Sequence, residues 1–224
     1  MRGWTGRPGR GFAVAMLSAV VGLGGPAGCM TTSPPEDEEE PQVAVDQNDP
    51  DDHILAAGDP QVTVIEYLDL ECPICGRFAR EIFPTLREEY VDTGKVRWIV
   101  RHFPLTSRHP HAELAAQAAE CAADQSVFWQ YIDELFNNQA FLEQADLVDY
   151  AVALGLDGEA LEACIVSGDK LERVDRDVTS GWEVDINGTP GFIIEDTVVV
   201  GILELDDFRM RLDQLLEDDA PALD

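Results

Sequence analysis

The chain has 224 residues, which is enough for one or two domains around a single good hydrophobic core. It carries 44 acidic residues against 15 Lys and Arg, so its formal net charge is −29. This balance excludes nucleic-acid binding through phosphates, because such binding needs clustered positive charge. It indicates a well-solvated surface and neutral or cationic partners.

The N-terminus differs from the rest of the chain. Residues 1–28 combine a basic start, a short apolar stretch and small residues, the pattern of a secretory signal peptide. The apolar stretch is too short and too broken by glycine for a transmembrane helix. Ala27-Gly28-Cys29 resembles the end of a bacterial lipobox, although Pro26 stands where Leu is usual. We expect export with lipidation at Cys29; a plain cleaved signal and an uncleaved anchor are the alternatives.

An acidic segment follows the signal. Residues 29–58 are rich in Pro, Asn and acidic residues and have no periodic apolar pattern, which predicts a disordered linker. Order is expected to begin near Val62. Residues 219–224 form a short acidic tail.

Hydrophobic patterning predicts alternating strands and helices, which indicates an α/β fold with a mixed sheet. The predicted elements are a strand at 62–70, a helix at 72–90 interrupted by Pro84, a strand at 96–103, a helix at 112–124, a helix capped by Ser126, helices at 145–154, 158–166 and 171–184, a hairpin at 192–200 turning at Glu195-Asp196, and a helix at 205–215.

The most informative motif is Cys72-Pro73-Ile74-Cys75 at the junction between the first strand and its helix. At a helix N-terminus, Cys72 would meet unpaired N–H groups and the positive dipole end, which stabilise a thiolate. Pro73 suits the first helical turn, where an N–H has no partner. Cys75 lies one turn further in and fits a resolving thiol. The alternatives are an inert structural disulfide and a zinc site, but the chain has no second CxxC.

Without Cys29, four cysteines remain, an even number that fits two disulfides in an exported chain. Three pairings are possible, and pairing Cys72 with Cys75 leaves Cys121 with Cys164. Two buried free thiols at positions 121 and 164 are the alternative. Closing this loop of about 40 residues would contribute ~3–4 kcal/mol.

Residues 53–218 resemble a thioredoxin-fold oxidoreductase of the DsbA-like type. Six segments carry the resemblance, and together they follow the family's element order: Glu66-Tyr-Leu-Asp-Leu-Glu-Cys-Pro-Ile-Cys75, Tyr90-Val-Asp-Thr-Gly-Lys-Val-Arg-Trp98, Arg101-His-Phe-Pro-Leu105, Ala118-Ala-Glu-Cys-Ala-Ala-Asp-Gln125, Phe128-Trp129 and Asn187-Gly-Thr-Pro-Gly-Phe192. The resemblance implies a domain at 59–218 with a helical insertion at about 106–185.

The resemblance also implies residue roles. Cys72 would be the nucleophile and Cys75 the resolving thiol, while Glu66 would be a buried acid that exchanges a proton with Cys75. The alternative for Glu66 is an ordinary exposed acid on a strand. Thr189-Pro190 would form a cis peptide beside the disulfide and offer backbone groups to an extended substrate; its alternative is a trans turn.

The residues between the cysteines and before them bear on redox direction. Strongly oxidising members of the family have Pro-His where this chain has Pro73-Ile74, and Ile74 donates no hydrogen bond. Negative charges at Asp69 and Glu71 would oppose a thiolate at Cys72. A weaker oxidant is therefore expected, which leaves the physiological direction open.

No cofactor and no metal site are expected, because His109-Pro-His111 lacks an accompanying cysteine or well-spaced acid. The expected partners are cysteine-containing exported proteins, a membrane redox partner that recycles the active-site pair, and the membrane through the lipid anchor. The predicted location is periplasmic or otherwise extracytoplasmic. Alternatives to an oxidant are a thioredoxin-like reductase and a membrane-tethered module that binds peptides or metal without turnover.

Overall fold

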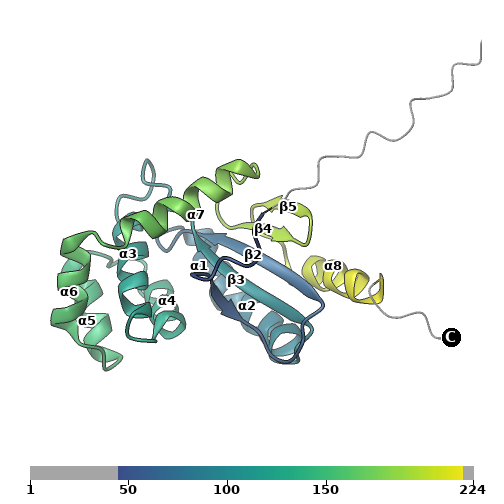
Figure 1. The fold of residues 1–224 in the computed structure, drawn as a ribbon, viewed down its shortest axis with the longest axis horizontal. Coiled ribbons are helices and arrows are strands. Elements are labelled where there is room, and N and C mark those ends of the chain that lie inside the picture. The colour runs from purple at the N-terminus through teal and green to yellow at the C-terminus, as the bar shows by residue number, and fades with distance from the viewer. Residues whose placement is uncertain (1–44, 219–224) are drawn as a thin grey trace, which may run out of the picture. The chain divides into compact units, whose positions relative to one another are not determined.

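The structure, a computed structural model, describes residues 45–218 (Figure 1). The expected signal peptide, Cys29 and the C-terminal tail at 219–224 lie outside the described residues. The elements are β1 (His53–Leu55), β2 (Val62–Leu68), α1 (Pro73–Arg77), η1 (Phe78–Ile82), α2 (Phe83–Leu86), η2 (Arg87–Val91), β3 (Val96–His102), α3 (Ala112–Ala123), α4 (Phe128–Asn137), α5 (Gln144–Ala153), α6 (Gly158–Ser167), α7 (Leu171–Glu183), β4 (Gly191–Ile194), β5 (Thr197–Val200) and α8 (Leu205–Asp218).

The strands form one five-stranded mixed sheet in the order β1-β3-β2-β4-β5. β2 runs parallel to β3, and the other neighbouring pairs are antiparallel. The β4–β5 hairpin turns at Glu195-Asp196, as predicted. The expected mixed α/β sheet is confirmed. Among residues 45–218, no helix combines the length and the apolar character that a membrane crossing needs.

The central strand β2 is buried on both faces, which explains its nearly continuous apolar sequence. Successive side chains of a strand point to opposite faces. Leu68 packs in the cluster that contains Phe78 of η1 and Phe208 of α8, whereas Ile65 and Tyr67 pack in the cluster beside α7. Figure 1 shows α7 on one side of the sheet and the α1–η2 helical segment on the other. The pleat thereby directs Glu66 towards the same face as Leu68.

The start of the described chain differs from the predicted linker at 29–58. His53–Leu55 form β1, which pairs antiparallel with β3 at one edge of the sheet. Arg101 of β3 binds the buried carboxylate of Asp52 at 2.8–2.9 Å. The predictions that order begins near Val62 and that the domain begins at 59 are therefore wrong. Amino-acid composition could not reveal that Asp52 forms an ion pair with Arg101, which is distant in sequence.

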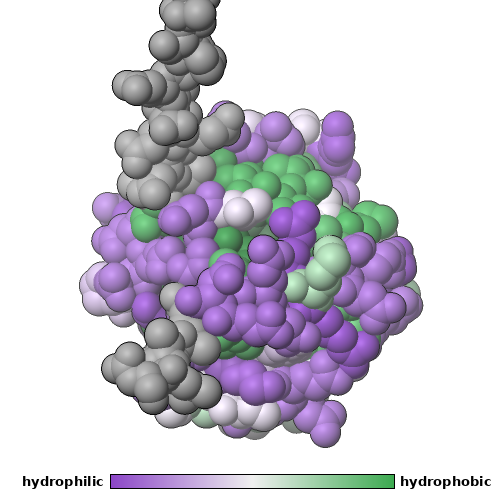
Figure 2. Space-filling model, turned by 90° about the vertical axis from the view of Figure 1, so that its right-hand side faces the viewer, coloured by the Kyte–Doolittle hydropathy of each residue, from purple (hydrophilic) through white to green (hydrophobic). Residues whose placement is uncertain are grey.

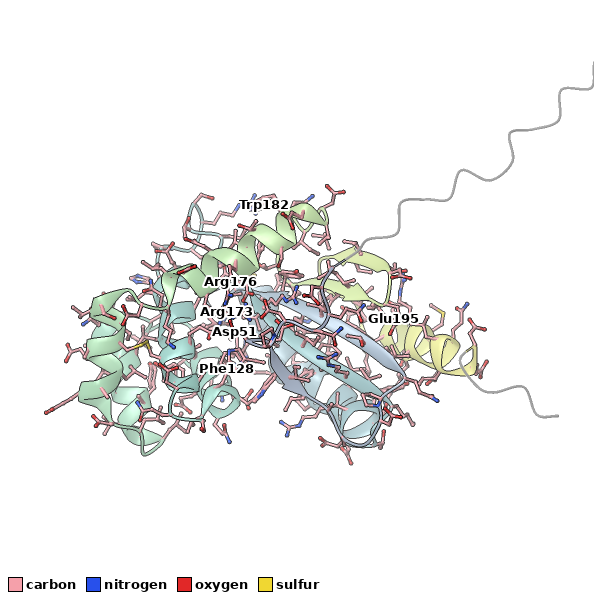
Figure 3. The ribbon with its side chains drawn as sticks, in the orientation of Figure 1. Asp51, Phe128, Arg173, Arg176, Trp182 and Glu195 are labelled. Atoms are coloured by element: carbon pink, nitrogen blue, oxygen red, sulfur yellow. A yellow bond between two sulfur atoms is a disulfide. The ribbon has the colours of Figure 1, made fainter. Side chains whose placement is uncertain are left out.

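Helix α7 also binds the N-terminal segment that contains Asp51 and Asp52. Arg176 donates to Asp51 at 2.6 Å, and Figure 3 shows both side chains close to Arg173. A cavity of about 450 Å³ lies between this segment, α3 and α7. None of the predicted site residues lines it.

Two local predictions change in the structure. The interruption at Pro84 takes the form of the π-helical turn η1, in which the Phe83 N–H bonds Phe78 five residues back. Proline lacks the N–H that a regular turn would use. Ser126 does not cap α4: it has φ +63°, and Val127 is the N-cap residue without a side-chain bond. The Ser126 N–H instead bonds the Ala123 carbonyl at the end of α3.

Candidate active site

The Cys72–Cys75 motif sits where β2 passes into α1. Cys72 is the N-cap residue of α1 and Pro73 is its first helical residue. Cys72 Sγ lies 3.5 Å from the Thr189 carbonyl oxygen and donates to it. Both cysteines are buried and not bonded to each other, so the structure shows the reduced pair. The strand end and the helix start therefore present Cys72 to the loop before β4.

The two thiols differ strongly in acidity. A hydrogen bond from the Cys75 side chain, helped by the backbone N–H groups of Cys75 and Ile74, lowers the pKa of Cys72 to about 5 against the opposing effect of burial. Burial raises the pKa of Cys75 well above its usual range, and the neighbouring Cys72 thiolate adds to this effect. At neutral pH the arrangement holds one thiolate and one thiol.

Glu66 is the buried acid of β2, six residues before Cys72 in the sequence. Its side chain is buried, and the Trp98 Nε1–H donates to Oε2 at 3.0 Å. Burial raises the pKa of Glu66 to about 8, although the Trp98 bond opposes the rise. The Glu66 charge also contributes to the raised pKa of Cys75, so the two groups lie within electrostatic reach. The structure places Glu66 in the interior, unlike an ordinary exposed strand acid.

The peptide bond between Thr189 and Pro190 is cis. Pro190 is buried, and its carbonyl accepts the N–H of Gly201 at 2.8 Å. This loop leads directly into β4. Between the two cysteines, Pro73 and Ile74 are exposed, and Ile74 retains 42 % of its accessible surface.

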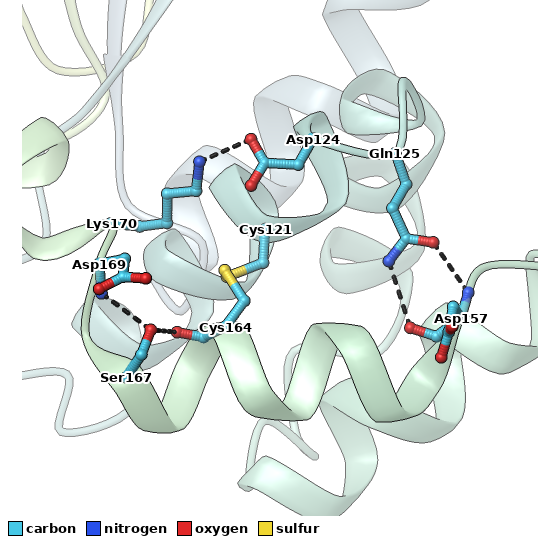
Figure 4. Close-up of a disulfide and its surroundings, with 8 residues drawn as sticks. All are labelled: Cys121, Asp124, Gln125, Asp157, Cys164, Ser167, Asp169 and Lys170. Atoms are coloured by element: carbon cyan, nitrogen blue, oxygen red, sulfur yellow. Dashed lines mark hydrogen bonds and ion pairs between the residues drawn. A yellow bond between two sulfur atoms is a disulfide. The ribbon is translucent and has the colours of Figure 1, made fainter.

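Cys121 of α3 and Cys164 of α6 form a disulfide with a Cα–Cα distance of 6.0 Å (Figure 4). Polar contacts flank it on either side. Gln125 and Asp157 exchange two hydrogen bonds of 2.8 and 3.2 Å, and Lys170 binds Asp124 at 2.6 Å. This disulfide therefore lies inside the helical insertion that separates β3 from β4.

Sequence reasoning missed two groups that touch the active-site turn. Gln139, in the loop after α4, donates through Nε2 to the carbonyls of Leu70 and Cys72 at 2.9 and 2.8 Å. Asp69, interpreted from sequence as a charge opposing the thiolate, is buried and accepts the Cys72 N–H at 3.0 Å. No local pattern could reveal either contact, because the partners converge from separate elements.

The histidines are engaged in ordinary polar contacts. His53 and His102 both approach Glu120 Oε1 through Nε2, at 2.9 and 3.0 Å. His109 Nδ1 lies 2.8 Å from Asp69. The part of the chain at 45–218 contains no group of three or more His, Cys, Asp or Glu side chains arranged to hold a metal ion.

A sequence model of a family described as Thioredoxin matches residues 48–214. The chain belongs to the thioredoxin family. Among solved structures, Wolbachia pipientis alpha-DsbA1 is 26 % identical with a TM-score of 0.68, over 75 % of this chain and 92 % of its own. A thioredoxin-like oxidoreductase from Silicibacter pomeroyi DSS-3 is 25 % identical with a TM-score of 0.68, over 77 % and 96 %.

The BdbD structure from Bacillus subtilis, 24 % identical with a TM-score of 0.69 over 75 % of this chain and 94 % of its own, supports the fold. The expected thioredoxin fold with a helical insertion is confirmed. So is the expected activity class: the chain is a thiol:disulfide oxidoreductase of the DsbA-like type.

Curated relatives match over part of their length only. The Na(+)/H(+) antiporter NhaA 3 of Salinispora tropica is 41 % identical over 147 residues, which are 65 % of this chain and 22 % of that protein. The NhaA antiporter of Herminiimonas arsenicoxydans is 40 % identical over 156 residues, 69 % of this chain and 24 % of its own. The chain thus spans about a quarter of these relatives, and the antiporter name describes those whole proteins.

Proposed function

We propose that this thioredoxin-family protein is an exported oxidant that passes a Cys72–Cys75 disulfide to cysteines of other extracytoplasmic proteins. The observation that carries the proposal is the asymmetry of the two thiols. A Cys72 pKa of about 5 means that the reduced enzyme is stabilised as a thiolate. Stabilising the reduced form makes the disulfide a stronger oxidant.

The exchange proceeds in two substitutions at sulfur. A substrate thiolate attacks Cys72 Sγ in the disulfide, the bond to Cys75 breaks, and Cys75 leaves and takes up a proton. A second substrate thiolate then attacks the substrate sulfur of the mixed disulfide and releases Cys72 as a thiolate. The substrate loses two electrons and the Cys72–Cys75 pair gains them.

Glu66 is proposed to handle the proton of Cys75. With a pKa of about 8, its carboxyl group is mostly protonated at neutral pH and can supply a proton as Cys75 leaves. The same group accepts the proton when Cys75 attacks a mixed disulfide to resolve it. No cofactor takes part in either direction.

Thr189, Pro190, Pro73 and Ile74 are proposed to bind the substrate chain around Cys72. The backbone at Thr189 lies beside the nucleophile at the start of β4, where an extended peptide can add as a strand. The exposed apolar side chain of Ile74 offers a further contact. Backbone pairing of this kind accepts many sequences, as an oxidant of varied proteins requires.

Export and anchoring remain part of the proposal. Residues 1–28 have the pattern of a signal peptide, and Cys29 is the proposed lipidation site. The Cys121–Cys164 disulfide supports an oxidising compartment such as the periplasm, since such bonds rarely persist in the cytosol. A membrane redox partner would recycle the Cys72–Cys75 pair.

The test is oxidative refolding of a reduced, unfolded secreted enzyme whose activity returns only when its disulfides form. The oxidised protein is expected to restore activity while its own 72–75 pair becomes reduced. Cys72→Ser and Cys75→Ser should each abolish the effect, because neither variant can form the 72–75 disulfide that oxidises the substrate. Mixed with a substrate that already carries a disulfide, Cys75→Ser should accumulate a mixed disulfide at Cys72, because no second thiol of the enzyme is left to resolve it.

Two other outcomes contradict the proposal. If the oxidised protein leaves substrate thiols untouched while the reduced protein opens substrate disulfides, the chain is a reductase. If Cys72→Ser retains full function in cells, the chain is a binding module and the 72–75 pair is not its working part.

A further inference from the structure

Asp69 follows the last residue of β2 and begins the turn that carries the nucleophile Cys72. Its Oδ1 accepts the backbone N–H groups of Glu71 and Cys72, at 2.8 and 3.0 Å. Its Oδ2 accepts the Leu105 N–H and lies 2.8 Å from His109 Nδ1, with the Leu105 bond also 2.8 Å long. The Asp69 side chain has no exposed surface. Four donors therefore converge on one buried carboxylate.

These four donors come from two separate parts of the chain. Glu71 and Cys72 belong to the turn between β2 and α1, whereas Leu105 and His109 belong to the loop after β3. Burying a carboxylate costs free energy unless its oxygens accept hydrogen bonds. The four donors therefore stabilise buried Asp69 and, with it, the conformation of the turn. Asp69 joins the active-site turn to the loop that follows β3.

A second carboxylate repeats the link between the same two segments. Glu71 Oε2 accepts the backbone N–H of His111 at 2.6 Å. The Phe103 N–H bonds the Leu68 carbonyl at 2.7 Å, where β2 ends. Among all these donors, the imidazole of His109 is the one side-chain group, so it can be removed without altering the backbone.

The link bears on the chemistry of Cys72 through its backbone. Asp69 accepts the Cys72 N–H, while the Cys72 sulfur is stabilised first by the Cys75 side chain and then by the backbone N–H groups of Cys75 and Ile74. A turn that is free to shift would carry Sγ out of line with those donors. Loss of the His109 donor would also leave the Asp69 negative charge less compensated beside a thiolate. Both effects disfavour the thiolate.

We propose that Asp69 and His109 are positioning residues for thiol–disulfide exchange: His109 donates to Asp69, and Asp69 fixes the backbone at Cys72 so that the sulfur faces the helix N-terminus. This inference rests on the proposed role of Cys72 as nucleophile. Because a carboxylate only accepts hydrogen bonds, His109 carries its hydrogen on Nδ1.

The test is a pH titration of the Cys72 thiolate by its ultraviolet absorbance in the reduced protein. His109→Ala is expected to raise the titration midpoint by up to about one pH unit. The upper bound is the full energy of one hydrogen bond, about 1–1.5 kcal/mol, and only the part that differs between thiolate and thiol reaches Cys72. His109→Asn should restore the midpoint, because its amide N–H can take the place of Nδ1–H. His111→Ala is the matched control, because the contact made by His111 uses its backbone N–H.

The result that overturns the inference is a His109→Ala midpoint equal to that of the wild type. His109→Asn titrating like His109→Ala, or His111→Ala shifting as far as His109→Ala, would overturn it equally. If His109→Ala does not fold, His109→Phe fills the same space without a donor and is expected to show the same rise. A wild-type Cys72 that titrates like a free thiol would instead contradict the proposed function itself.

Discussion

At the scale of single residues, the fold divides three acids of the same site between two protonation states. Cys72 is held as a thiolate by hydrogen bonds, whereas Cys75 and Glu66 are kept protonated at neutral pH mainly by burial. The helix N-terminus and the pleat of β2 set these environments. Exchange needs this division, because one sulfur must be a good leaving group while a nearby group moves a proton.

Glu66→Gln is predicted to stabilise the oxidised protein at neutral and alkaline pH. With a pKa of about 8, Glu66 keeps its proton in the folded state up to about pH 8, while the unfolded chain loses it near the ordinary glutamate pKa of 4.5. Stability therefore falls as pH rises between these values and stays level above them. At pH 7 the variant should gain on the order of 3 kcal/mol over the wild type. Urea unfolding of both proteins across this pH range measures the difference.

The oxidised form is used because Cys72 and Cys75 do not titrate in it. The difference should vanish below about pH 4.5, where both states hold the proton. A constant difference at every pH would mean that Glu66 is ionised in the folded protein. In the same variant, Cys75 should leave more slowly in the exchange reaction, because its proton donor has been removed.

At the scale of elements, the Cys121–Cys164 disulfide cross-links α3 and α6 within the helical insertion. The bonded residues are 43 positions apart in sequence. A cross-link of this span limits the unfolded chain far more than the folded one. The disulfide is thus expected to act on stability and not on the redox cycle.

The double variant Cys121→Ala/Cys164→Ala is predicted to lose about 3–4 kcal/mol of unfolding free energy on chain-entropy reasoning. It should still oxidise substrate thiols through Cys72 and Cys75. Denaturant unfolding and the refolding assay measure the two properties separately. Loss of exchange in a variant that remains folded would contradict this division of roles.

The N-terminal segment is a second element whose anchoring can be tested. Asp52 has no exposed side-chain surface and binds Arg101, whose side chain is 4 % exposed. Asp52→Ala would leave that guanidinium buried without its carboxylate, which typically costs about 3–5 kcal/mol. Asp51→Ala is the matched control, since its partner Arg176 is half exposed and surface pairs contribute about 0–1 kcal/mol. Equal losses in thermal or urea unfolding would refute the buried-pair account.

At the scale of the whole molecule, the chain carries a formal net charge of −29. Figure 2 shows a face on which hydrophilic side chains predominate. Charge of this size slows the approach of anionic reactants and favours neutral or cationic ones. The effect weakens with salt, because ions screen the field over about 10 Å at 0.1 M.

Salt is therefore predicted to accelerate the reaction of reduced Cys72 with a dianionic aromatic disulfide. A neutral dipyridyl disulfide serves as the control and should react at a rate that barely changes. At about 1 M salt, where the screening length is about 3 Å, further salt should no longer change either reaction rate appreciably, so the two reagents should behave alike. Stopped-flow traces that show the same salt dependence for both reagents would argue against a global electrostatic effect.

The sequence predicted much of this architecture because its elements carry strong local patterns. The strands at 62–70 and 96–103, the CxxC helix and the hairpin at 192–200 all have periodicity or turn residues that act locally. β1 was missed because it is three residues long and owes its place to pairing with β3 and to the Asp52–Arg101 pair. Ser126 was misread because the turn that closes α3 uses its backbone.

The candidate site was predictable in identity but not in environment. Spacing selected Cys72 and Cys75, and the family resemblance implied a buried Glu66, yet neither indicated that Trp98 of a neighbouring strand donates to the Glu66 carboxyl group. Asp69 was interpreted as a charge that opposes the thiolate, because its donor at His109 lies 40 residues away in sequence. Tertiary contacts of this kind decide whether an acid opposes a nucleophile or holds it in place.

The central claim is that the low Cys72 pKa makes the Cys72–Cys75 disulfide an oxidant. The most direct test is the reduction potential of that pair in glutathione buffers, with Cys121–Cys164 followed separately by mass spectrometry. The account predicts a value between about −120 and −180 mV, the range of DsbA and protein disulfide isomerase. A value near −270 mV, that of thioredoxin, would contradict it and identify a reductase.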